Sequence, residues 1–482
     1  MGVGAKHQRI GLIAGPALAG VLIAIGVPED LSAAAWRTAA LGVLMGVWWA
    51  TEALPVAATA LVPIALFPLL GIADLRAVTA PFANPTIYLF LGGFMVALAI
   101  QRWDLHRRIA LAVIAAAGGT GASLVGGFMV ASALISMWVT NTATTMMLLP
   151  IATSVVAIVH EHLGDSVAAR ERFAIAMMLG VAYGATIGGM ATLVGTPPNA
   201  LLAAFMQERF GTPIGFAQWM LVGLPLSIVL LPLCWWLLTA RLYPVPFSTR
   251  GEVRDHLRRL RRDAGPMTSA QKRVVAIFLA LAGGWMMRPL LTRMPSLEGL
   301  SDTGLAVLAA LALFLVPSAA AGSPRLLTWR DVRDLPWGLL LLFGGGLSLA
   351  AAVSSSGLAT WLGERLMAIG FSGLTMLVIA VVVLIIFLTE LTSNLATTAT
   401  FLPVVAAVAV EAGHAPIALC VPVALAASCA FMLPVATPPN AVVYGSGLVT
   451  IADMVRAGFW LNLIGVVVVS LVALLLAPPL LG

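Results

Sequence analysis

Asparagine and threonine side chains interrupt two of the most apolar parts of this 482-residue chain. Residues 140–145 read Thr-Asn-Thr-Ala-Thr-Thr, and residues 393–398 read Ser-Asn-Leu-Ala-Thr-Thr. Polar groups at membrane depth are costly unless they are satisfied, and their oxygen atoms suit a hard cation such as sodium. A single such residue usually bonds a neighbouring helix. Because the motif occurs twice, at matching places in two halves, it predicts a solute-binding site.

A second duplicated motif, Thr-Pro-Pro-Asn, covers residues 196–199 and 437–440. Each copy lies inside a long apolar run. Two successive prolines remove backbone donors and disrupt a helix, so each run is expected to unwind there. Unwound segments near the bilayer midplane are typical of the binding sites of secondary transporters.

We expect each Asn-bearing motif to form the tip of a re-entrant hairpin, with one half-helix before it and another after it. Thr142 would then lie near the N-cap of the second half-helix. The tip would offer free N–H groups and the positive end of a helix dipole to an anion. Carbonyl and side-chain oxygens on its other side would bind sodium. Such a site binds an anion without a buried Arg or Lys.

The composition, 61% hydrophobic and 10% charged with a mean hydropathy of +1.03, indicates a polytopic membrane protein. No nucleotide-binding loop occurs, so ATP is not expected to drive it. The net charge of +6 comes from basic residues in short loops, which indicates membrane topology and no nucleic-acid partner. The three cysteines lie in apolar sequence without disulfide or metal-site spacing: Cys234, Cys420 and Cys429.

The elements that position these motifs are predicted to be an all-α set of about 11 transmembrane helices plus two re-entrant hairpins. The hairpins pair 121–139 with 142–159, and 373–391 with 395–411. The predicted spans lie near 10–27, 36–54, 56–71, 84–101, 172–207, 214–240, 273–290, 302–317, 336–356, 416–448 and 456–480.

The spacing of the motifs predicts two inverted repeats. Asn394 follows Asn141 by 253 residues, whereas Pro439 follows Pro198 by 241. An odd number of crossings separates equivalent spans, so the copies face opposite ways, which is the usual basis of alternating access. The first repeat is predicted to cover 1–240, with its hairpin at 121–159 and its unwound helix at 172–207. A basic connector covers 241–272. The second repeat is predicted to cover 273–482, with its hairpin at 373–411 and its unwound helix at 416–448.

The distribution of arginines predicts the orientation in the inner (plasma) membrane. The connector holds Arg254, Arg258, Arg259, Arg261 and Arg262. Cytoplasmic loops carry an excess of basic residues, so the N-terminus is expected in the cytoplasm and the C-terminus outside.

Several ionisable residues remain open in their roles. Glu52 is a candidate proton or cation site, or it marks the end of a span beside Pro55. Glu390 is the second candidate, or it satisfies hairpin backbone. Three histidines among loop charges are expected to be solvated: His106, His160 and His162.

At these residues the chain resembles the divalent anion:sodium symporters over essentially its whole length. The resemblance rests on 48–55 (Trp-Trp-Ala-Thr-Glu-Ala-Leu-Pro), the two tips and the two Thr-Pro-Pro-Asn loops. It implies a homodimer in which each protomer has a scaffold domain and a transport domain that moves like an elevator. It implies one sodium site at Ser136, Thr140, Asn141 and backbone near Gly195, and a second at Thr389, Thr392, Asn394 and backbone near Ala436. It places the anion on Asn141, Thr142, Ser393, Asn394, Thr196 and Thr437.

Two residues depart from the pattern of that family. Thr140 replaces the usual Ser and keeps a hydroxyl, whereas Leu395 stands where a second hydroxyl is often found. The resemblance implies a secondary transporter, not an enzyme, that imports a C4-dicarboxylate such as succinate with two or more sodium ions and no organic cofactor. A sodium-independent anion exchanger or a sulfate permease on the same fold stays open, with a channel and an intramembrane hydrolase behind them.

Overall fold

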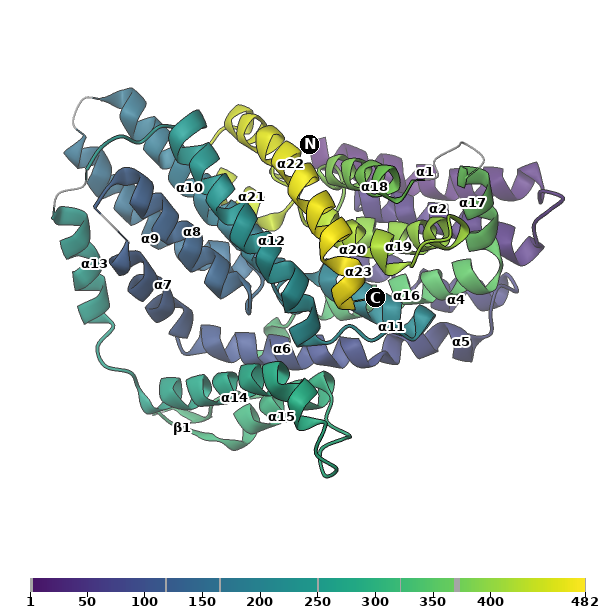
Figure 1. Ribbon diagram of the computed structural model, residues 1–482, viewed down its shortest axis with the longest axis horizontal. Coiled ribbons are helices and arrows are strands. Elements are labelled where there is room, and N and C mark those ends of the chain that lie inside the picture. The colour runs from purple at the N-terminus through teal and green to yellow at the C-terminus, as the bar shows by residue number, and fades with distance from the viewer. Residues whose placement is uncertain are drawn as a thin grey trace.

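The computed structural model describes residues 3–117, 119–163, 166–248, 251–320, 322–367 and 373–481, and these residues are mainly helical. Nine of the described helices are long and apolar enough to cross a membrane, and five more apolar helices are 10–17 residues long. Strands occur in this part of the chain only as the antiparallel pair β1 (Pro317–Ala320) and β2 (Ser323–Arg325). The prediction of an all-α polytopic membrane protein is confirmed (Figure 1).

The N-terminal helices run through the first four predicted spans. The predicted span at 56–71 is divided into two short helices, which Ala60 and Leu61 separate, and Pro63 lies in the first turn of the second helix. These helices are α1 (Val3–Ile25), α2 (Ala33–Thr51), α3 (Val56–Thr59), α4 (Val62–Leu69), α5 (Leu75–Thr79), η1 (Ala80–Ala83), α6 (Pro85–Arg102) and α7 (Leu105–Ala116).

Each predicted re-entrant segment is a pair of helices joined by a turn of four residues. The first pair is α8 (Gly121–Ser136) and α9 (Asn141–His162), and the second pair is α18 (Leu374–Thr389) and α19 (Asn394–Glu411). The helix cap differs from the prediction: Thr140, not Thr142, is the N-cap of α9, and its side chain accepts the Ala143 N–H. Thr142 therefore lies inside the first turn of α9.

Both Thr-Pro-Pro-Asn motifs follow a non-helical loop. The chain leaves helix between α10 (Val167–Gly189) and α11 (Pro197–Phe210), and again between α20 (Ile417–Ala427) and α21 (Pro438–Tyr444). Thr196 and Thr437 have extended backbone, and the two prolines occupy the first positions of the next helix. Proline fits there because these N–H groups have no intrahelical partner in any case.

The remaining elements include a basic helix between the two halves. α13 buries Val253 and Leu257, and it leaves Arg258 and Arg262 exposed. These elements are α12 (Phe216–Trp236), η2 (Leu237–Leu242), α13 (Glu252–Asp263), α14 (Ser269–Leu291), α15 (Asp302–Leu315), η3 (Asp331–Asp334), α16 (Trp337–Ser355), α17 (Leu358–Met367), α22 (Ile451–Leu475) and α23 (Ala477–Leu481).

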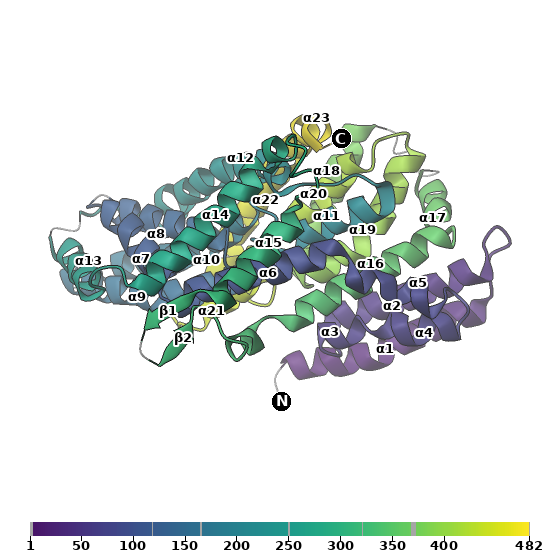
Figure 2. The same ribbon diagram turned by 90° about the horizontal axis from the view of Figure 1, so that it is seen from below.

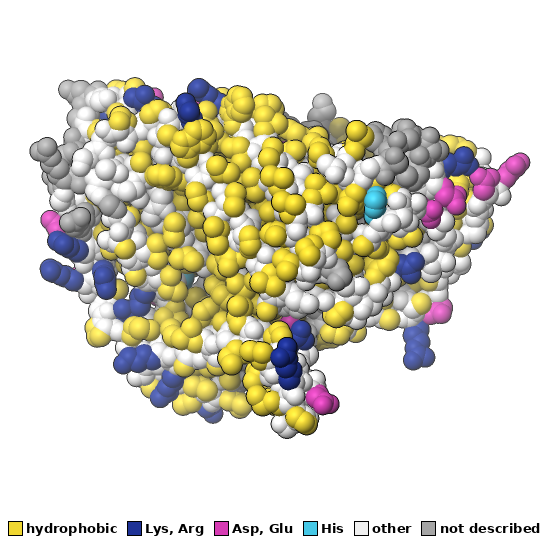
Figure 3. Space-filling model, viewed as in Figure 1, with side chains coloured by type: hydrophobic (Ala, Val, Ile, Leu, Met, Phe, Trp, Pro, Cys, Tyr) yellow, Lys and Arg dark blue, Asp and Glu magenta, His cyan; other side chains and the backbone are white. Residues whose placement is uncertain are grey.

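The helices differ in how far they are covered by the rest of the molecule. In α10 89% of the residues in an apolar stretch long enough to span the membrane are buried, compared with 17% in the corresponding stretches of α1 and α14. α10 is therefore central, whereas α1 and α14 present apolar surface to the outside. The start of α1 and the C-terminal α23 lie at opposite edges in Figure 2. In Figure 3 basic side chains gather toward the edge where α13 lies and acidic ones toward the opposite edge, with an apolar band between.

The prediction of solvated histidines is wrong for His106. His106 is only 8% exposed, because α7, the helix that carries it, packs against α8, α13 and α6. Its Nδ1 lies 3.3 Å from the Ile100 carbonyl oxygen. His160 is half-buried, with Nε2 3.0 Å from the Arg170 carbonyl oxygen, and the His162 side chain lies outside the described residues.

Candidate solute-binding site at the hairpin tips

A cavity of about 940 Å³ lies where the two hairpin tips meet the two unwound loops. This volume is at the upper end of the range for ligand pockets, about 300–1,000 Å³. All six residues predicted to hold the anion line it: Asn141, Thr142, Thr196, Ser393, Asn394 and Thr437. Thr140, Gly195 and Ala436 from the predicted cation sites line it as well. The other three, Ser136, Thr389 and Thr392, do not line it.

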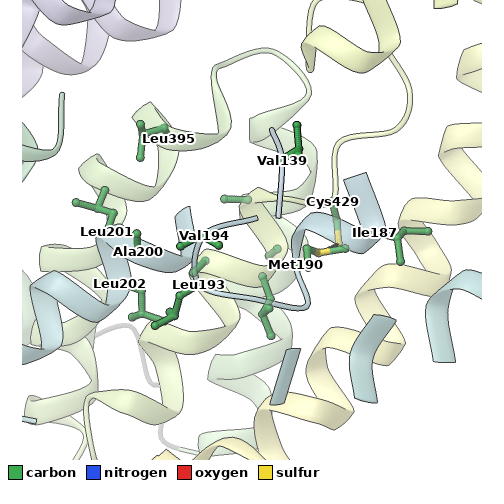
Figure 4. Close-up of a cluster of buried hydrophobic side chains, with 14 of the residues drawn as sticks. Val139, Ile187, Met190, Leu193, Val194, Ala200, Leu201, Leu202, Leu395 and Cys429 are labelled. Atoms are coloured by element: carbon green, nitrogen blue, oxygen red, sulfur yellow. Dashed lines mark hydrogen bonds between the residues drawn. The ribbon is translucent and has the colours of Figure 1, made fainter. Parts of the chain in front are cut away.

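Apolar side chains make up most of the remaining wall. Leu395 lines the cavity and is only 4% exposed, so most of the residue that replaces a hydroxyl is packed against its neighbours. Figure 4 shows it in a cluster of buried hydrophobic residues with Val194 and Leu201. In the same cluster Met190 and Cys429 point toward one another, with their sulfur atoms 4.0 Å apart. The two unwound loops therefore pack against each other.

Oxygen atoms surround the side-chain amide of Asn141. One end of this amide lies 2.6 Å from Ser136 Oγ and 3.3 Å from the carbonyl oxygens of Gly195 and Ala185. With its nitrogen turned toward these acceptors, the amide donates to all three. With Oδ1 turned toward them, the amide adds its own oxygen to three others, and oxygens of these kinds are the ligands that a hard cation prefers.

The second tip repeats this arrangement 253 residues later. Thr389 Oγ1 donates to Asn394 Oδ1 at 2.9 Å, in the place where Ser136 contacts Asn141. The same hydroxyl lies 3.0 Å from the Ala427 carbonyl oxygen. Thr392 Oγ1 lies 2.5 Å from Thr397 Oγ1, so this hydroxyl bonds within the hairpin. The structure thus brings Thr389 to the second asparagine and directs Thr392 to another threonine.

The asparagines of the Thr-Pro-Pro-Asn motifs stabilise the unwound loops. Asn199 Nδ2 donates to the carbonyl oxygens of Thr192 at 2.8 Å and Met190 at 3.2 Å. Asn440 Nδ2 donates in the same way to Leu433 at 3.1 Å and Ala430 at 3.3 Å. Both asparagines are fully buried, and non-helical backbone at membrane depth needs such partners. Their duplication was the available sequence signal for this role.

The two tips are joined to their loops by different chemistry. In the first half the Thr192 hydroxyl donates to the Met137 carbonyl oxygen at 2.5 Å. In the second half the Glu390 carboxylate occupies the position of Met137, 253 residues on. It accepts the backbone N–H groups of Phe431 at 2.7 Å, Met432 at 2.9 Å and Leu433 at 3.1 Å. It also accepts Asn462 Nδ2 of α22 at 2.7 Å.

Glu390 therefore acts as a structural clasp, and the backbone that it satisfies is that of the unwound loop, not that of its own hairpin. The side chain is 3% exposed and does not line the cavity. Unwound backbone leaves N–H groups without helical partners, and a carboxylate that accepts several of them is a strong internal acceptor. The clasp fixes residues 431–433 close to Ala436, a residue that lines the cavity.

We expect Glu390→Gln to destabilise the protein by about 1–3 kcal/mol, because one carboxylate oxygen becomes an NH₂ group facing backbone donors. Thermal unfolding of the purified protein measures the change. Glu411→Gln at the exposed end of α19 is the matched control and should leave the unfolding temperature unchanged. A Glu390→Gln protein as stable as the wild type, with altered cation dependence only, would instead assign Glu390 to transport.

Helix N-termini face the cavity from both hairpins. α9 begins at Asn141 and α19 at Asn394, and α11 begins at Pro197 beside Thr196. Each N-terminus carries a partial positive charge of about half an elementary charge. No side chain caps α19, so its first-turn N–H groups are not bonded by Ser393. These termini favour an anionic group in the cavity.

The side chains that line the cavity provide no full positive charge. Lys, Arg and His are absent from the lining formed by the described residues, and Glu52 is the acid among them. A dianion in a mostly apolar cavity needs more compensation than partial charges and neutral donors give. The arrangement is therefore suited to binding an anion together with cations held at the oxygen clusters.

Comparisons with known proteins agree with these features. The family model described as "Sodium:sulfate symporter transmembrane region" matches residues 6–482. The chain is 39% identical over 479 residues to a sodium-dependent dicarboxylate transporter SdcS of Staphylococcus saprophyticus, covering 98% of this chain and 92% of that protein. It is also 39% identical over 481 residues to an SdcS of Staphylococcus aureus, with the same coverage of 98% and 92%.

Among solved structures, the YdaH transporter of Alcanivorax borkumensis has a similar fold. The TM-score is 0.56, and the alignment covers 90% of this chain and 98% of that chain. The sequence identity is 14%, so this likeness concerns the fold alone.

Proposed function

Because this chain belongs to the sodium:sulfate symporter family, we propose that it is a secondary active transporter that imports a C4-dicarboxylate such as succinate together with sodium ions. The observation that carries the proposal is the charge of the cavity. Two oxygen clusters adjoin an anion site that has no Lys, Arg or His in its described lining. A dianion and sodium would each lower the cost of bringing the other out of water, and this reciprocity couples their binding.

One sodium ion is proposed at the first tip, on Ser136, Thr140, Asn141 and the Gly195 carbonyl. The Ala185 carbonyl, which faces the same amide, is a further candidate ligand. In this proposal Asn141 turns Oδ1 toward the ion, so the amide reverses when sodium binds. Oxygen ligands of these kinds are those that hard cations prefer.

The second sodium ion is proposed on Thr389, Thr392, Asn394 and the Ala436 backbone. Thr389 supports this assignment, because its hydroxyl already faces Asn394 Oδ1 and the Ala427 carbonyl. Thr392 would have to leave Thr397, its partner at 2.5 Å, to reach the ion. We therefore expect Thr392 to contribute less than Thr389.

The substrate would lie between the tips, on Asn141, Thr142, Ser393, Asn394, Thr196 and Thr437. The relatives named above are described as dicarboxylate transporters, whereas the family model is described by sulfate. Two separated tips suit a molecule with an anionic group at each end better than a compact oxyanion. A C4-dicarboxylate is therefore the first substrate to test.

Leu395 is proposed to weaken one end of this site, because its side chain donates no hydrogen bond. Leu395→Thr should improve succinate binding by about tenfold or more, because a hydrogen bond to a charged group contributes about 1.5–3 kcal/mol. The measurement is the inhibition of labelled succinate uptake by unlabelled dicarboxylates, citrate and sulfate. A competition profile identical to that of the wild type would show that this position does not set specificity.

The transport cycle is proposed to be of the elevator type in a homodimer built from inverted repeats. The cavity reaches the end of α2 at Glu52, the end of α6 at Gln101 and the start of α16 at Pro336. Arg102 comes directly after Gln101, and Arg333 comes shortly before Pro336. Because cytoplasmic loops carry an excess of basic residues, these arginines would place this edge in the cytoplasm. The described conformation is then open to the inside.

The test of this function is uptake of labelled succinate into proteoliposomes that hold the purified protein. An inward sodium gradient should drive uptake, and choline in place of sodium should abolish it. Uptake that ignores sodium but requires internal unlabelled succinate would make the protein an exchanger. No succinate uptake, with uptake of labelled sulfate in its place, would make it an oxyanion permease.

A further inference from the structure

The backbone at Glu52 has a conformation that glycine usually supplies. Glu52 ends α2 with φ 48° and ψ 37°, and its N–H bonds the carbonyl oxygens of Trp48 and Trp49. Helices commonly end in this left-handed conformation, and Gly is the usual residue because a Cβ is strained there. Only two other described non-glycine residues have positive φ, Asp104 and Ala319. The local fold at this position therefore favours glycine over glutamate.

The turn that carries Glu52 is held firmly at the wall of the cavity. Trp49 is fully buried, and its indole Nε1 donates to the Val56 carbonyl oxygen at 3.2 Å across the turn. Pro55 lies between them and has a fixed φ. Glu52 itself is exposed and lines the cavity that contains both hairpin tips. The side chain is thus presented to the cavity by a rigid turn.

Glu52 brings an uncompensated negative charge to this cavity. Its carboxylate takes part in none of the hydrogen bonds and ion pairs of the described residues. Arg102, beside the cavity-lining Gln101, is already paired with Asp331 and bonds Ser323 Oγ. Among the described residues that line the cavity, Glu52 is the only Asp, Glu, Lys, Arg or His.

The position of Glu52 is separate from the proposed ion and anion sites. It lies at the end of α2, near the ends of α6 and α16 that border the cavity, whereas the binding residues belong to the tips and unwound loops. Glu52 thus borders the same cavity as the tips, at the edge formed with Gln101 and Pro336. The site geometry described above does not use it.

We propose that the Glu52 carboxylate is a transit site for sodium at the cytoplasmic mouth of the cavity, where it attracts the departing cation and repels the dianionic substrate. This inference rests on the proposed function. A carboxylate about 10 Å from a dianion in water-like surroundings disfavours the dianion about fourfold and favours sodium about twofold. Both effects weaken as salt screens the charge.

The test compares variants in inside-out membrane vesicles, where the cytoplasmic face receives added succinate and sodium. Glu52→Gln should lower the KM for succinate about two- to fourfold and raise the half-saturating sodium concentration about twofold. Glu52→Gly should do the same without loss of thermal stability, because glycine suits the backbone. Glu52→Asp should behave as the wild type. Glu298→Gln, an exposed acid in the loop after α14, is the matched control.

A lower KM for succinate together with a higher half-saturating sodium concentration, both changes becoming smaller when choline chloride is added, would show that the charge of Glu52 is responsible. A merely structural role would not produce this combination. Unchanged constants in Glu52→Gln, or shifts that Glu52→Asp shares or that persist at high ionic strength, would overturn the proposal alone. A wild-type protein without sodium-dependent succinate flux in either vesicle orientation would overturn the proposed function and this inference with it.

Discussion

Asn141→Ala is expected to lower sodium-coupled uptake by about 100-fold or more, because one amide serves both the cation and the anion site. The amide contacts Ser136 Oγ at 2.6 Å and lies 3.3 Å from the Gly195 and Ala185 carbonyl oxygens, and it lines the cavity as well. Each lost hydrogen bond to a charged group costs about 1.5–3 kcal/mol, and two ligands are affected. Asn394→Ala is expected to act in the same way at the second tip.

The measurement is the initial rate of labelled succinate uptake, normalised to the amount of folded protein in the membrane. Thr153→Ala is a suitable control on the same helix, because Thr153 lies away from the tip and bonds only the Pro150 carbonyl, at 3.0 Å. This control should transport normally. Wild-type uptake by a well-folded Asn141→Ala protein would contradict the assignment of the binding site to the first hairpin tip.

Gly189→Ala is expected to have the second largest effect, because the end of α10 closes tightly around the Asn141 amide. A Cβ on Gly189 would lie 2.4 Å from Asn141 Oδ1 and 3.1 Å from the Gly195 carbonyl oxygen. Real side chains do not approach so closely, so the amide or the loop must move. Overpacking of this kind costs about 1–3 kcal/mol, which corresponds to about 5- to 150-fold in sodium affinity.

The sodium dependence of uptake measures this effect, with the half-saturating concentration as the readout. Gly283→Ala in α14 makes the same chemical change where no atom lies within 4 Å of the added Cβ, and it should leave transport intact. If Gly189→Ala kept the sodium dependence of the wild type, the oxygen cluster around Asn141 would not be a cation site.

The helix breaks at the polar motifs are features for which the sequence carries local signals. Asn141 and Asn394 begin helices after short turns, and the Pro-Pro pairs begin helices after unwound segments, as polar motifs inside apolar runs indicate. The N-cap was misplaced by two residues, since Thr140 and Thr142 both have the side chain that a cap needs. The fold class followed from composition alone.

The supporting contacts were harder to predict because they join residues far apart in the chain. Glu390 accepts N–H groups 41–43 residues away and an amide 72 residues away. Sequence left its role open, and only the assembled loop shows which donors surround it. His106 was misjudged for a similar reason. Charged residues flank it in the sequence, but it is buried because its helix, α7, packs against α8 and α13. Local polarity predicts solvation only where nothing packs over the residue.

The halves of the protein share their site chemistry and differ in how the tips are braced. A threonine hydroxyl, Thr192, joins the first tip to its loop, whereas a buried carboxylate, Glu390, joins the second. The carboxylate makes more bonds and lies away from the cavity. We expect the second tip to keep its shape more strongly, so that the first tip responds more to the occupancy of its cation site.

The central claim is that sodium supplies the positive charge that the anion site lacks. The measurement that tests it most directly is the steady-state ratio of internal to external labelled succinate in proteoliposomes with an inward sodium gradient. The account predicts accumulation above the external concentration, which collapses when a sodium ionophore dissipates the gradient. A ratio that reaches only unity, or one that is the same with sodium equal on both sides, would contradict it.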